Sequence, residues 1–189
     1  MLLKKDKRKI LFFRESVYKV AEKIFNEPNK SFHLRGISLS SGISTTAGVN
    51  AIKELEQYGI VKVEKTPITS NIKANQESDS YLFYKKIFNL YRLERYEVIK
   101  SIINTFRAKT VVLFGSFSKG EDIENSDIDI LIISNRKGNE SFNKYIRKVE
   151  KLLNRKINFI ILSSLEKSSN EFKNSIVNGI VLHGYLKVI

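Results

Sequence analysis

The feature that most constrains the fold is a short apolar run that ends in glycine and serine. The run is Val111-Val112-Leu113-Phe114, and its length and branched residues predict a buried strand. It continues into Gly115-Ser116, whose small side chains leave backbone amides open to an anion such as phosphate. The chain is therefore expected to have a strand that leads directly into an anion-binding turn.

Two aspartates follow this turn after an acidic stretch. Asp127 and Asp129 are separated by one residue, so on a strand both side chains point to the same face and can hold cations between them. The alternating isoleucines Ile128, Ile130 and Ile132 are then expected to point into a core. The sequence thus places an anion-binding turn one loop away from two carboxylates.

Gly115-Ser116, ten residues and Asp127-x-Asp129 together resemble the signature of the polymerase-beta-type nucleotidyltransferase superfamily, specifically its minimal nucleotidyltransferase branch. The resemblance extends from about Ile99 onward. It implies that Gly115 and Ser116 bind the phosphates of a nucleoside triphosphate, with ATP favoured. It also implies that Asp127 and Asp129 are catalytic and hold Mg²⁺ or Mn²⁺ for in-line attack on the α-phosphorus.

One position departs from the pattern of that superfamily. Members that catalyse usually carry a third carboxylate on a later strand, and the matching run, a predicted buried strand from Lys156 to Leu162, has Asn158 in its place. An amide oxygen binds a cation weakly and cannot accept a proton from an attacking hydroxyl, so Asn158 is a weak metal ligand at best. Nucleotide and metal binding can therefore survive without turnover.

Other polar residues near the motif have less defined roles. Glu121, Asp122 and Glu124 precede the aspartates and could replace the missing carboxylate, although a solvated acidic loop is the favoured interpretation. Lys119 stands where many relatives carry arginine, and it can neutralise phosphate charge only as a point charge. We assign it to nucleotide binding, with a solvated loop lysine as the alternative.

The net charge of +13 and the pI of about 9.8 favour a polyanionic partner, because phosphate contacts by Lys and Arg release counterions. Residues 1–107 contain 20 Lys and Arg against 11 Asp and Glu, and residues 108–189 contain 13 against 9. Most of the excess thus lies in the first half. The chain is also rich in Lys, Asn and Ile throughout, so part of this charge can be compositional.

Cysteine is absent and only two histidines occur, which excludes disulfides and thiolate metal sites and argues against a zinc cluster. No uncharged run approaches the length needed to cross a bilayer. A cytoplasmic protein without a membrane partner is therefore expected.

The first half has the pattern of a helix-turn-helix. A short amphipathic helix from Phe32 is interrupted at Ser41-Gly42-Ile43, and Ser44 can cap a second helix with apolar residues at three-residue steps. The segment that follows alternates like a strand, passes the turn-prone region of Thr66-Pro67 and Thr69-Ser70-Asn71, and returns toward Tyr81. The span from about Ser16 to Leu90 resembles winged-helix transcriptional regulators.

In winged-helix regulators the second helix enters the major groove and the wing contacts the backbone. The resemblance implies DNA as the favoured nucleic acid, with protein docking as the alternative. Gly48 weakens the second helix by about 1 kcal/mol relative to alanine. Such a residue is unusual in a rigid DNA-recognition helix. The predicted nucleic-acid-binding residues are Ser44, Thr45, Thr46, Asn50, Lys53, Lys62, Lys65 and Lys73.

These observations predict an α+β protein with a winged helix-turn-helix domain (1–80), a helical connector (81–107) and a minimal nucleotidyltransferase domain with a mixed sheet and flanking helices (108–189), one of them over Leu165 to Val177. Aromatic residues on the connector are expected to pack the core, or a homodimer interface as the alternative. The leading function is Mg²⁺-dependent transfer of a nucleoside monophosphate to a hydroxyl of nucleic acid or protein. The alternatives are a catalytically impaired DNA-binding regulator and an antitoxin that modifies or masks a protein partner.

Overall fold

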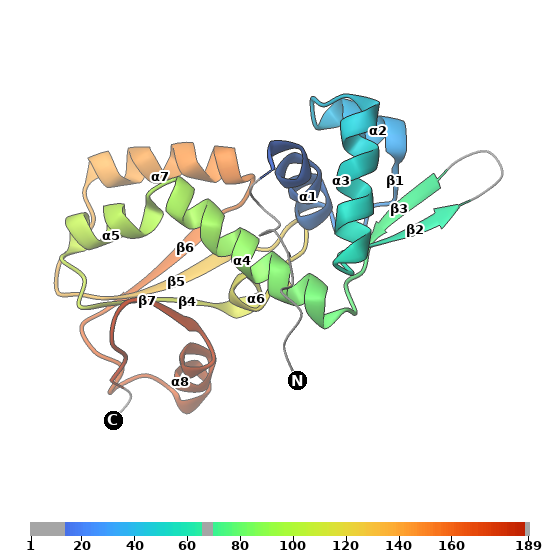
Figure 1. Cartoon of the computed structure of the whole chain (residues 1–189). Coiled ribbons are helices and arrows are strands. Elements are labelled where there is room, and N and C mark those ends of the chain that lie inside the picture. The colour runs from blue at the N-terminus through green and yellow to red at the C-terminus, as the bar shows by residue number, and fades with distance from the viewer. Residues whose placement is uncertain (1–13, 66–69, 188–189) are drawn as a thin grey trace, which may run out of the picture. The chain divides into compact units, whose positions relative to one another are not determined.

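The computed structural model describes residues 14–65 and 70–187, and its chain divides into two compact units, Met1–Tyr81 and Leu82–Ile189 (Figure 1). The turn residues Thr66, Pro67 and Thr69 of the predicted wing lie outside the described residues. The segment predicted as a connector forms two helices, with all residues after Tyr81 in the second unit. Among the described residues, no helix combines the length and the apolar character that crossing a bilayer requires.

The first unit contains three helices and a small antiparallel sheet whose strand order is β1-β3-β2. Its core is made by apolar side chains of all three helices, including Val20, Ile24 and Leu55, together with Ile72 on β3. The elements are α1 (Glu15–Asn26), β1 (Phe32–His33), α2 (Leu34–Ser40), α3 (Thr45–Gln57), β2 (Val61–Lys65) and β3 (Ser70–Ala74). The order of these elements follows the predicted helix-turn-helix and hairpin, and the assignment to the winged-helix class stays a prediction.

Helix α3 begins where the sequence predicts, because the Ser44 Oγ accepts a hydrogen bond from the Ala47 N–H at 3.2 Å. Gly48 has a packing reason that the sequence did not reveal. A Cβ at this position would overlap the Ser38 Oγ on α2, so the absence of a side chain lets α2 and α3 approach closely. The helix-weakening glycine is thus a requirement of the helix pair.

The second unit is built on a four-stranded mixed sheet with the order β6-β5-β4-β7. Strands β5 and β6 are parallel, whereas β4 is antiparallel to β5 and to β7. The elements are α4 (Asp79–Arg95, which begins before the division), α5 (Val98–Phe106), β4 (Thr110–Phe114), α6 (Gly115–Lys119), β5 (Ile128–Ile133), α7 (Glu140–Leu153), β6 (Ile157–Leu162), α8 (Asn170–Val177) and β7 (Ile180–Gly184). The predicted α+β class and mixed sheet are confirmed.

Two apolar layers cover the sheet of the second unit. Helices α5 and α7 lie on one face and α8 on the other (Figure 1). Ile128, Ile130 and Ile132 are fully buried under the first layer, as predicted from their alternation. Leu131 and Phe114 face the second layer, where Phe114 packs edge-on against Phe172 of α8.

Two expectations for this unit need correction. The apolar run from Lys156 to Leu162 predicts a buried strand, but β6 is an edge strand and Ile161 is exposed. The helix predicted over Leu165 to Val177 begins only at Asn170, where the Ser169 Oγ caps it by accepting from the Phe172 N–H. Sequence periodicity extends the helix into a segment that the cap excludes.

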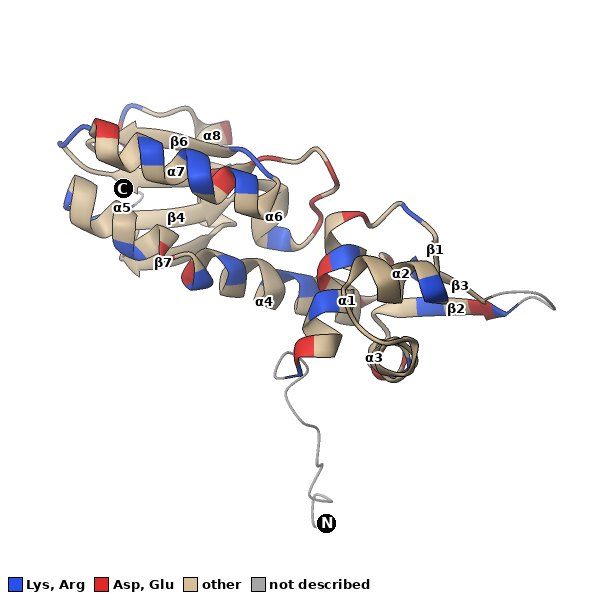
Figure 2. Cartoon of the chain, turned by 90° about the horizontal axis from the view of Figure 1, so that it is seen from above, with Lys and Arg blue, Asp and Glu red and all other residues tan. Residues whose placement is uncertain are grey.

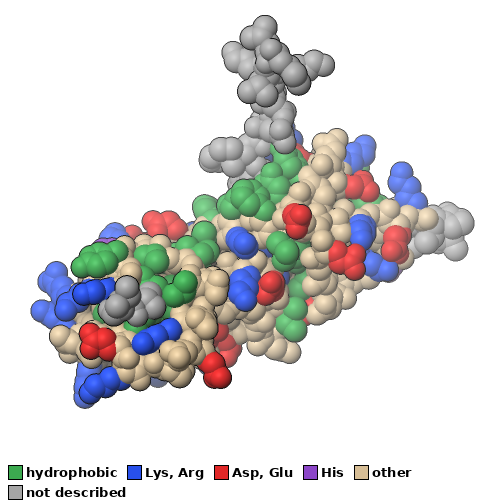
Figure 3. Space-filling model, turned by 90° about the horizontal axis from the view of Figure 1, so that it is seen from below, with side chains coloured by type: hydrophobic (Ala, Val, Ile, Leu, Met, Phe, Trp, Pro, Cys, Tyr) green, Lys and Arg blue, Asp and Glu red, His purple; other side chains and the backbone are tan. Residues whose placement is uncertain are grey.

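The surface of the described residues mixes apolar and charged side chains. Large apolar side chains are exposed at several places, among them Phe83, Leu152, Val177 and Tyr185. On the face drawn in Figure 3, hydrophobic side chains are interspersed with Lys and Arg. Single exposed apolar residues of this kind are normal for a folded protein.

Candidate active site

The candidate site lies at one end of the mixed sheet, where one residue from each of three neighbouring strands lies in a row. Phe114, the last residue of β4, pairs with Asp129 on β5, and Asp129 pairs with Asn158 on β6. Because β4 runs antiparallel to β5, its end meets the beginning of β5 and of β6. The Gly-Ser turn therefore emerges beside Asp129.

Asn158 connects the two aspartates directly. Its side-chain Nδ2 donates to the Asp127 Oδ2 at 3.1 Å and to the Asp129 Oδ1 at 3.2 Å. Both carboxylates therefore converge on one point, although only Asp129 lies on β5 and Asp127 immediately precedes that strand. The amide supplies hydrogen-bond donors at the position where two negative charges meet.

Gly115 closes the other side of Asp129. Its φ is +73°, in the left-handed region, and a Cβ there would lie 2.6 Å from the Asp129 Oδ2. Any side chain would thus be strained by the backbone and would displace the carboxylate. Glycine is required here because the turn and the aspartate must approach closely.

The remaining residues of the predicted phosphate site lie on α6. Ser116 is half-buried in its first turn, and the backbone carbonyl of Ser116 accepts from the Glu121 N–H at 3.0 Å. Lys119 is the last residue of α6 and is exposed, and no ion pair within the described residues involves it. The structure thus brings together Gly115, Asp127, Asp129 and Asn158, whereas Lys119 lies at the far end of a short helix.

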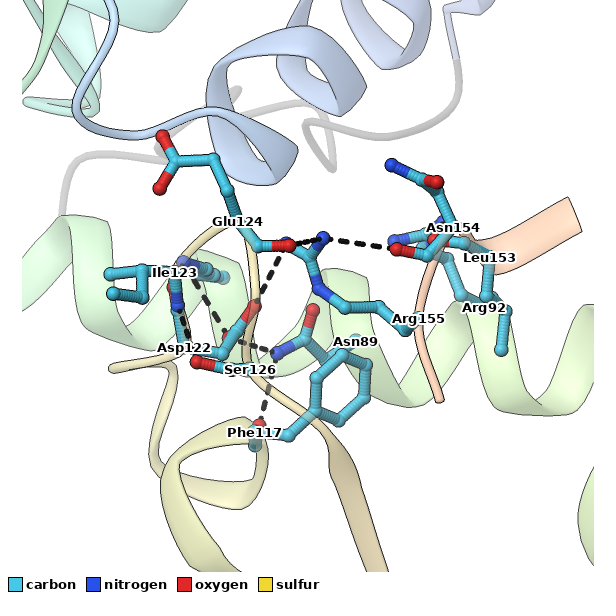
Figure 4. A network of polar contacts seen from close by, with 11 residues as sticks. Asn89, Arg92, Phe117, Asp122, Ile123, Glu124, Ser126, Leu153, Asn154 and Arg155 are labelled. Atoms are coloured by element: carbon cyan, nitrogen blue, oxygen red, sulfur yellow. Dashed lines mark hydrogen bonds and ion pairs between the residues drawn. The ribbon is translucent and has the colours of Figure 1, made fainter. Parts of the chain in front are cut away.

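A buried polar network supports the loop that leads to the aspartates (Figure 4). Asn89 on α4 donates through its Nδ2 to the Asp122 Oδ1 at 2.8 Å and to the Phe117 carbonyl at 2.9 Å. The Lys85 Nζ donates to the Asp122 carbonyl and lies 3.5 Å from its carboxylate. The Arg155 guanidinium lies 3.9 Å from the same carboxylate and donates to the Glu124 carbonyl at 2.5 Å.

The network corrects the interpretation of the acidic stretch as a solvated loop. Asp122 is only 2% exposed and serves as the shared acceptor of a helix and a loop, so it is not available to replace the missing carboxylate. Burial lowers the pKa of Lys85 from its ordinary value of 10.5, and the charge of Asp122 opposes that shift. Glu121 remains exposed, and Glu124 is half-buried.

Within residues 14–65 and 70–187, no group of three or more His, Cys, Asp or Glu side chains is placed to hold a metal ion. The candidate site therefore offers two carboxylates and one amide rather than three carboxylates. Oxygen ligands of this kind are the ones that Mg²⁺ prefers. The metal roles of Asp127, Asp129 and Asn158 stay predictions.

The predicted nucleic-acid-binding residues lie on helix α3 with its N-cap and on the hairpin of strands β2 and β3 in the first unit. Thr45, Thr46, Asn50 and Lys53 are exposed on α3. Two lysines of the hairpin already pair with acids: Lys62 lies 3.6 Å from Glu77, and Lys73 lies 3.0 Å from Glu64. The remaining predicted contacts are Ser44, which caps α3, and Lys65, which is exposed at the end of β2.

The strand order, the turn and the paired aspartates define a nucleotidyltransferase-type domain. A sequence model of the family described as "Nucleotidyltransferase domain" matches residues 95–183. The "Putative protein adenylyltransferase MJ1379" of Methanocaldococcus jannaschii is 33% identical over 69 residues, which are 35% of this chain and 69% of that protein. The chain therefore belongs to the nucleotidyltransferase domain family, as the resemblance of its motifs predicted.

Two solved structures are similar over part of the chain. A crystal structure of a toxin-antitoxin with AMP-PNP is 24% identical, with a TM-score of 0.37 over 47% of this chain and 72% of that one. A mutant of the toxin-antitoxin MntA-HpeT is 20% identical, with a TM-score of 0.36 over 47% and 71% of the two chains.

Proposed function

We propose that the chain transfers AMP from ATP to a hydroxyl group of a protein acceptor. The observation that carries this proposal is the convergence of Asp127 and Asp129 on the amide of Asn158, beside the close approach of Gly115. A protein acceptor is favoured over a nucleic acid by the relative from Methanocaldococcus jannaschii, whose name describes protein adenylylation.

The side chains of the site fit a divalent cation. Two carboxylates already share one hydrogen-bond donor, and a cation between them would replace that donor with a full positive charge. A half-turn of the Asn158 amide would present its Oδ1 as a third, neutral ligand. A bound Mg²⁺ or Mn²⁺ would stabilise the charge on the attacking and leaving oxygens.

The residues of the chain would then position the reacting groups. The backbone amides at Gly115 and Ser116 would hold the triphosphate through hydrogen bonds, and Asp127 and Asp129 would hold the cations. Asn158 cannot accept the proton of the acceptor hydroxyl, and Asp122 is buried and already an acceptor. The proton would therefore go to Glu121, Glu124 or solvent, and turnover is expected to be slow.

Labelled ATP tests this proposal. The full-length chain is incubated with Mg²⁺ or Mn²⁺, ATP labelled at the α-phosphate, and nuclease-treated soluble proteins. Label on a protein band is expected from α-labelled but not from γ-labelled ATP, and it should disappear in Asp127→Asn and Asp129→Asn. Glu166→Gln, which removes an exposed carboxylate elsewhere, is the matched control. Label that persists in the two aspartate variants would rule the proposal out.

A second candidate function is DNA binding by the first unit. The specific observation that favours it is the exposure of Thr45, Thr46, Asn50 and Lys53 on α3. A salt-dependent shift of duplex DNA is expected, and neutralising Lys62 and Lys65 should weaken it. Absence of binding at low salt would contradict this function.

The antitoxin alternative stays a prediction.

A further inference from the structure

A cavity of about 550 Å³ opens beside Asp127 in the second unit. One wall is the loop of Glu124, Asn125, Ser126 and Asp127, and the others are the last half of α7 and the segment from Asn154 to Lys156. Figure 2 shows Lys and Arg along α7, and two of these side chains, Arg147 and Lys151, line the cavity.

The cavity adjoins the aspartate pair at Asp127 and does not include the Gly-Ser turn. Asp127 lines the cavity, whereas Asp129, Gly115 and Ser116 do not. Gly115 instead approaches the Oδ2 of Asp129. In phosphoryl and nucleotidyl transfer the attacking and leaving oxygens are in line, on opposite sides of the phosphorus. If the triphosphate occupies the turn, the acceptor needs a separate site, and the cavity offers one beside Asp127.

Among the described residues, most of the charged groups in the cavity have partners, but two cations do not. The Glu150 carboxylate accepts from the Ile157 N–H at 3.0 Å and lies 3.9 Å from the Lys156 Nζ. Arg147 and Lys151 are exposed, and within the described residues neither takes part in an ion pair. They are four residues apart on α7 and therefore project side by side. Together they can attract two carboxylates of a bound segment.

We propose that this cavity binds the acceptor, and that the acceptor is a protein segment whose hydroxyl residue is flanked by acidic side chains. This inference rests on the proposed function and specifies its substrate. The hydroxyl oxygen bonds to the α-phosphorus while the bond from that phosphorus to the bridging oxygen breaks. The electron pair of the broken bond leaves with pyrophosphate, and the hydroxyl proton passes to Glu121, Glu124 or solvent.

Peptide binding tests the inference without requiring turnover. Two fluorescein-labelled peptides with a central tyrosine, one flanked by glutamates and one by lysines, are titrated with the full-length chain, and binding is followed by fluorescence anisotropy. The acidic peptide is expected to bind and the basic one not. In the double variant Arg147→Gln and Lys151→Gln the affinity for the acidic peptide should fall about five- to tenfold, the effect of two partly exposed charge contacts.

A matched variant separates the cavity from the general positive charge of the protein. Lys144 and Lys148 have the same spacing on the same helix but do not line the cavity, so Lys144→Gln with Lys148→Gln changes the charge equally. This variant should bind the acidic peptide like the wild type. An equal loss in both double variants, or no binding by the wild type, would overturn the inference. Displacement of the peptide by a short single-stranded RNA at lower concentration would overturn it in favour of a nucleic-acid acceptor.

Failure of the inference and failure of the proposed function give different results. If the wild type labels proteins from ATP but Arg147→Gln with Lys151→Gln labels the same proteins with an unchanged KM, the inference is wrong and the function stands. If the acidic peptide binds as expected but no protein is ever labelled, the function is wrong and the cavity is a peptide-binding site.

Discussion

Gly115 lies so close to Asp129 that a single added Cβ would come within 2.6 Å of the aspartate Oδ2. The positive φ of Gly115 makes the same substitution costly for the backbone, by about 1–2 kcal/mol. We therefore expect Gly115→Ala to lower the free energy of unfolding by about 2 kcal/mol and to weaken Mn²⁺ binding through displacement of the carboxylate. Urea unfolding and isothermal titration with Mn²⁺ measure the two effects.

Gly36 provides the control for this substitution. It lies on α2 and is exposed, and an added Cβ would have no heavy atom within 4 Å of it. Gly36→Ala should leave Mn²⁺ binding unchanged and stabilise the helix by about 0.5–1 kcal/mol. Unchanged stability and metal binding in Gly115→Ala would contradict the close approach.

Asn158→Asp should make the protein less stable without a bound metal ion. A bound metal ion should then stabilise the variant more than it stabilises the wild type. The variant loses the two hydrogen bonds that the amide donates and places a third carboxylate beside Asp127 and Asp129. In EDTA the free energy of unfolding should fall by about 1 kcal/mol. With Mn²⁺ the variant should gain more stability than the wild type, because three negative charges then surround the cation. Thermal unfolding with and without Mn²⁺ measures both differences.

Asn158→Ala separates the effect of the new charge from the loss of the amide. It should be destabilised in EDTA and should not recover with Mn²⁺.

If the missing carboxylate limits turnover, Asn158→Asp should also raise the rate of label transfer by about a hundredfold, the lower end of general-base contributions. If Mn²⁺ stabilised Asn158→Asp no more than it stabilises the wild type, residue 158 would not be a metal ligand.

The buried Lys85 should give the protein a specific pH dependence. Its pKa is lowered, chiefly by burial, so between the folded-state pKa and the ordinary 10.5 the unfolded chain holds more protons than the folded one. Stability therefore rises with pH through that window and does not depend on this group below it. The difference in unfolding free energy between wild type and Lys85→Met should increase toward alkaline pH.

Asp122→Asn tests the cause of this pH dependence. The Asp122 carboxylate raises the pKa of Lys85 against the effect of burial, while Arg155 lowers it and Glu124 raises it. Removing the carboxylate should lower the pKa further and extend the window to lower pH. Urea unfolding at several pH values, from neutral to alkaline, measures both variants. If the free energy of unfolding changed with pH in the same way in the wild type and in Lys85→Met, the lowered pKa of Lys85 would be contradicted.

Because α2 and α3 pack closely at Gly48, we expect a second substitution at Ser38 to restore stability that Gly48→Ala loses. Gly48→Ala should destabilise the first unit, because the new Cβ would overlap the Ser38 Oγ, whereas most helical glycines gain stability on this change. Combining it with Ser38→Gly should recover part of the loss. Circular dichroism during urea unfolding measures the three variants, and additive losses would show that the two positions do not interact.

The sequence predicted the parts of the site that depend on local pattern. The alternation around Asp127 and Asp129 and the small residues at Gly115 and Ser116 are local properties, and they define both the strand and the turn. The position of Asn158 opposite the aspartates followed from the family pattern, and the structure places its amide between them. The roles of these residues in binding metal and nucleotide stay predictions.

The parts that escaped prediction depend on contacts between distant segments. Lys85 and Asp122 are 37 residues apart, and acidic loops are usually solvated, so nothing local indicates that this carboxylate is buried. The one available signal is the spacing of Lys85 and Asn89, which places a lysine and an amide on the same side of a helix that otherwise buries Tyr81, Phe88 and Leu93. The contact of Gly48 with Ser38 is likewise invisible before the two helices meet.

The row of Phe114, Asp129 and Asn158 forms only when all three strands pair in the correct register. Side chains alternate across a sheet, so a slip of one residue between β5 and either neighbour would turn one member of the row to the opposite side. The two pairings join strands of different direction and must both be complete. A spectroscopic signal from a cation at these carboxylates would consequently report, during refolding, that all three strands have paired in the correct register.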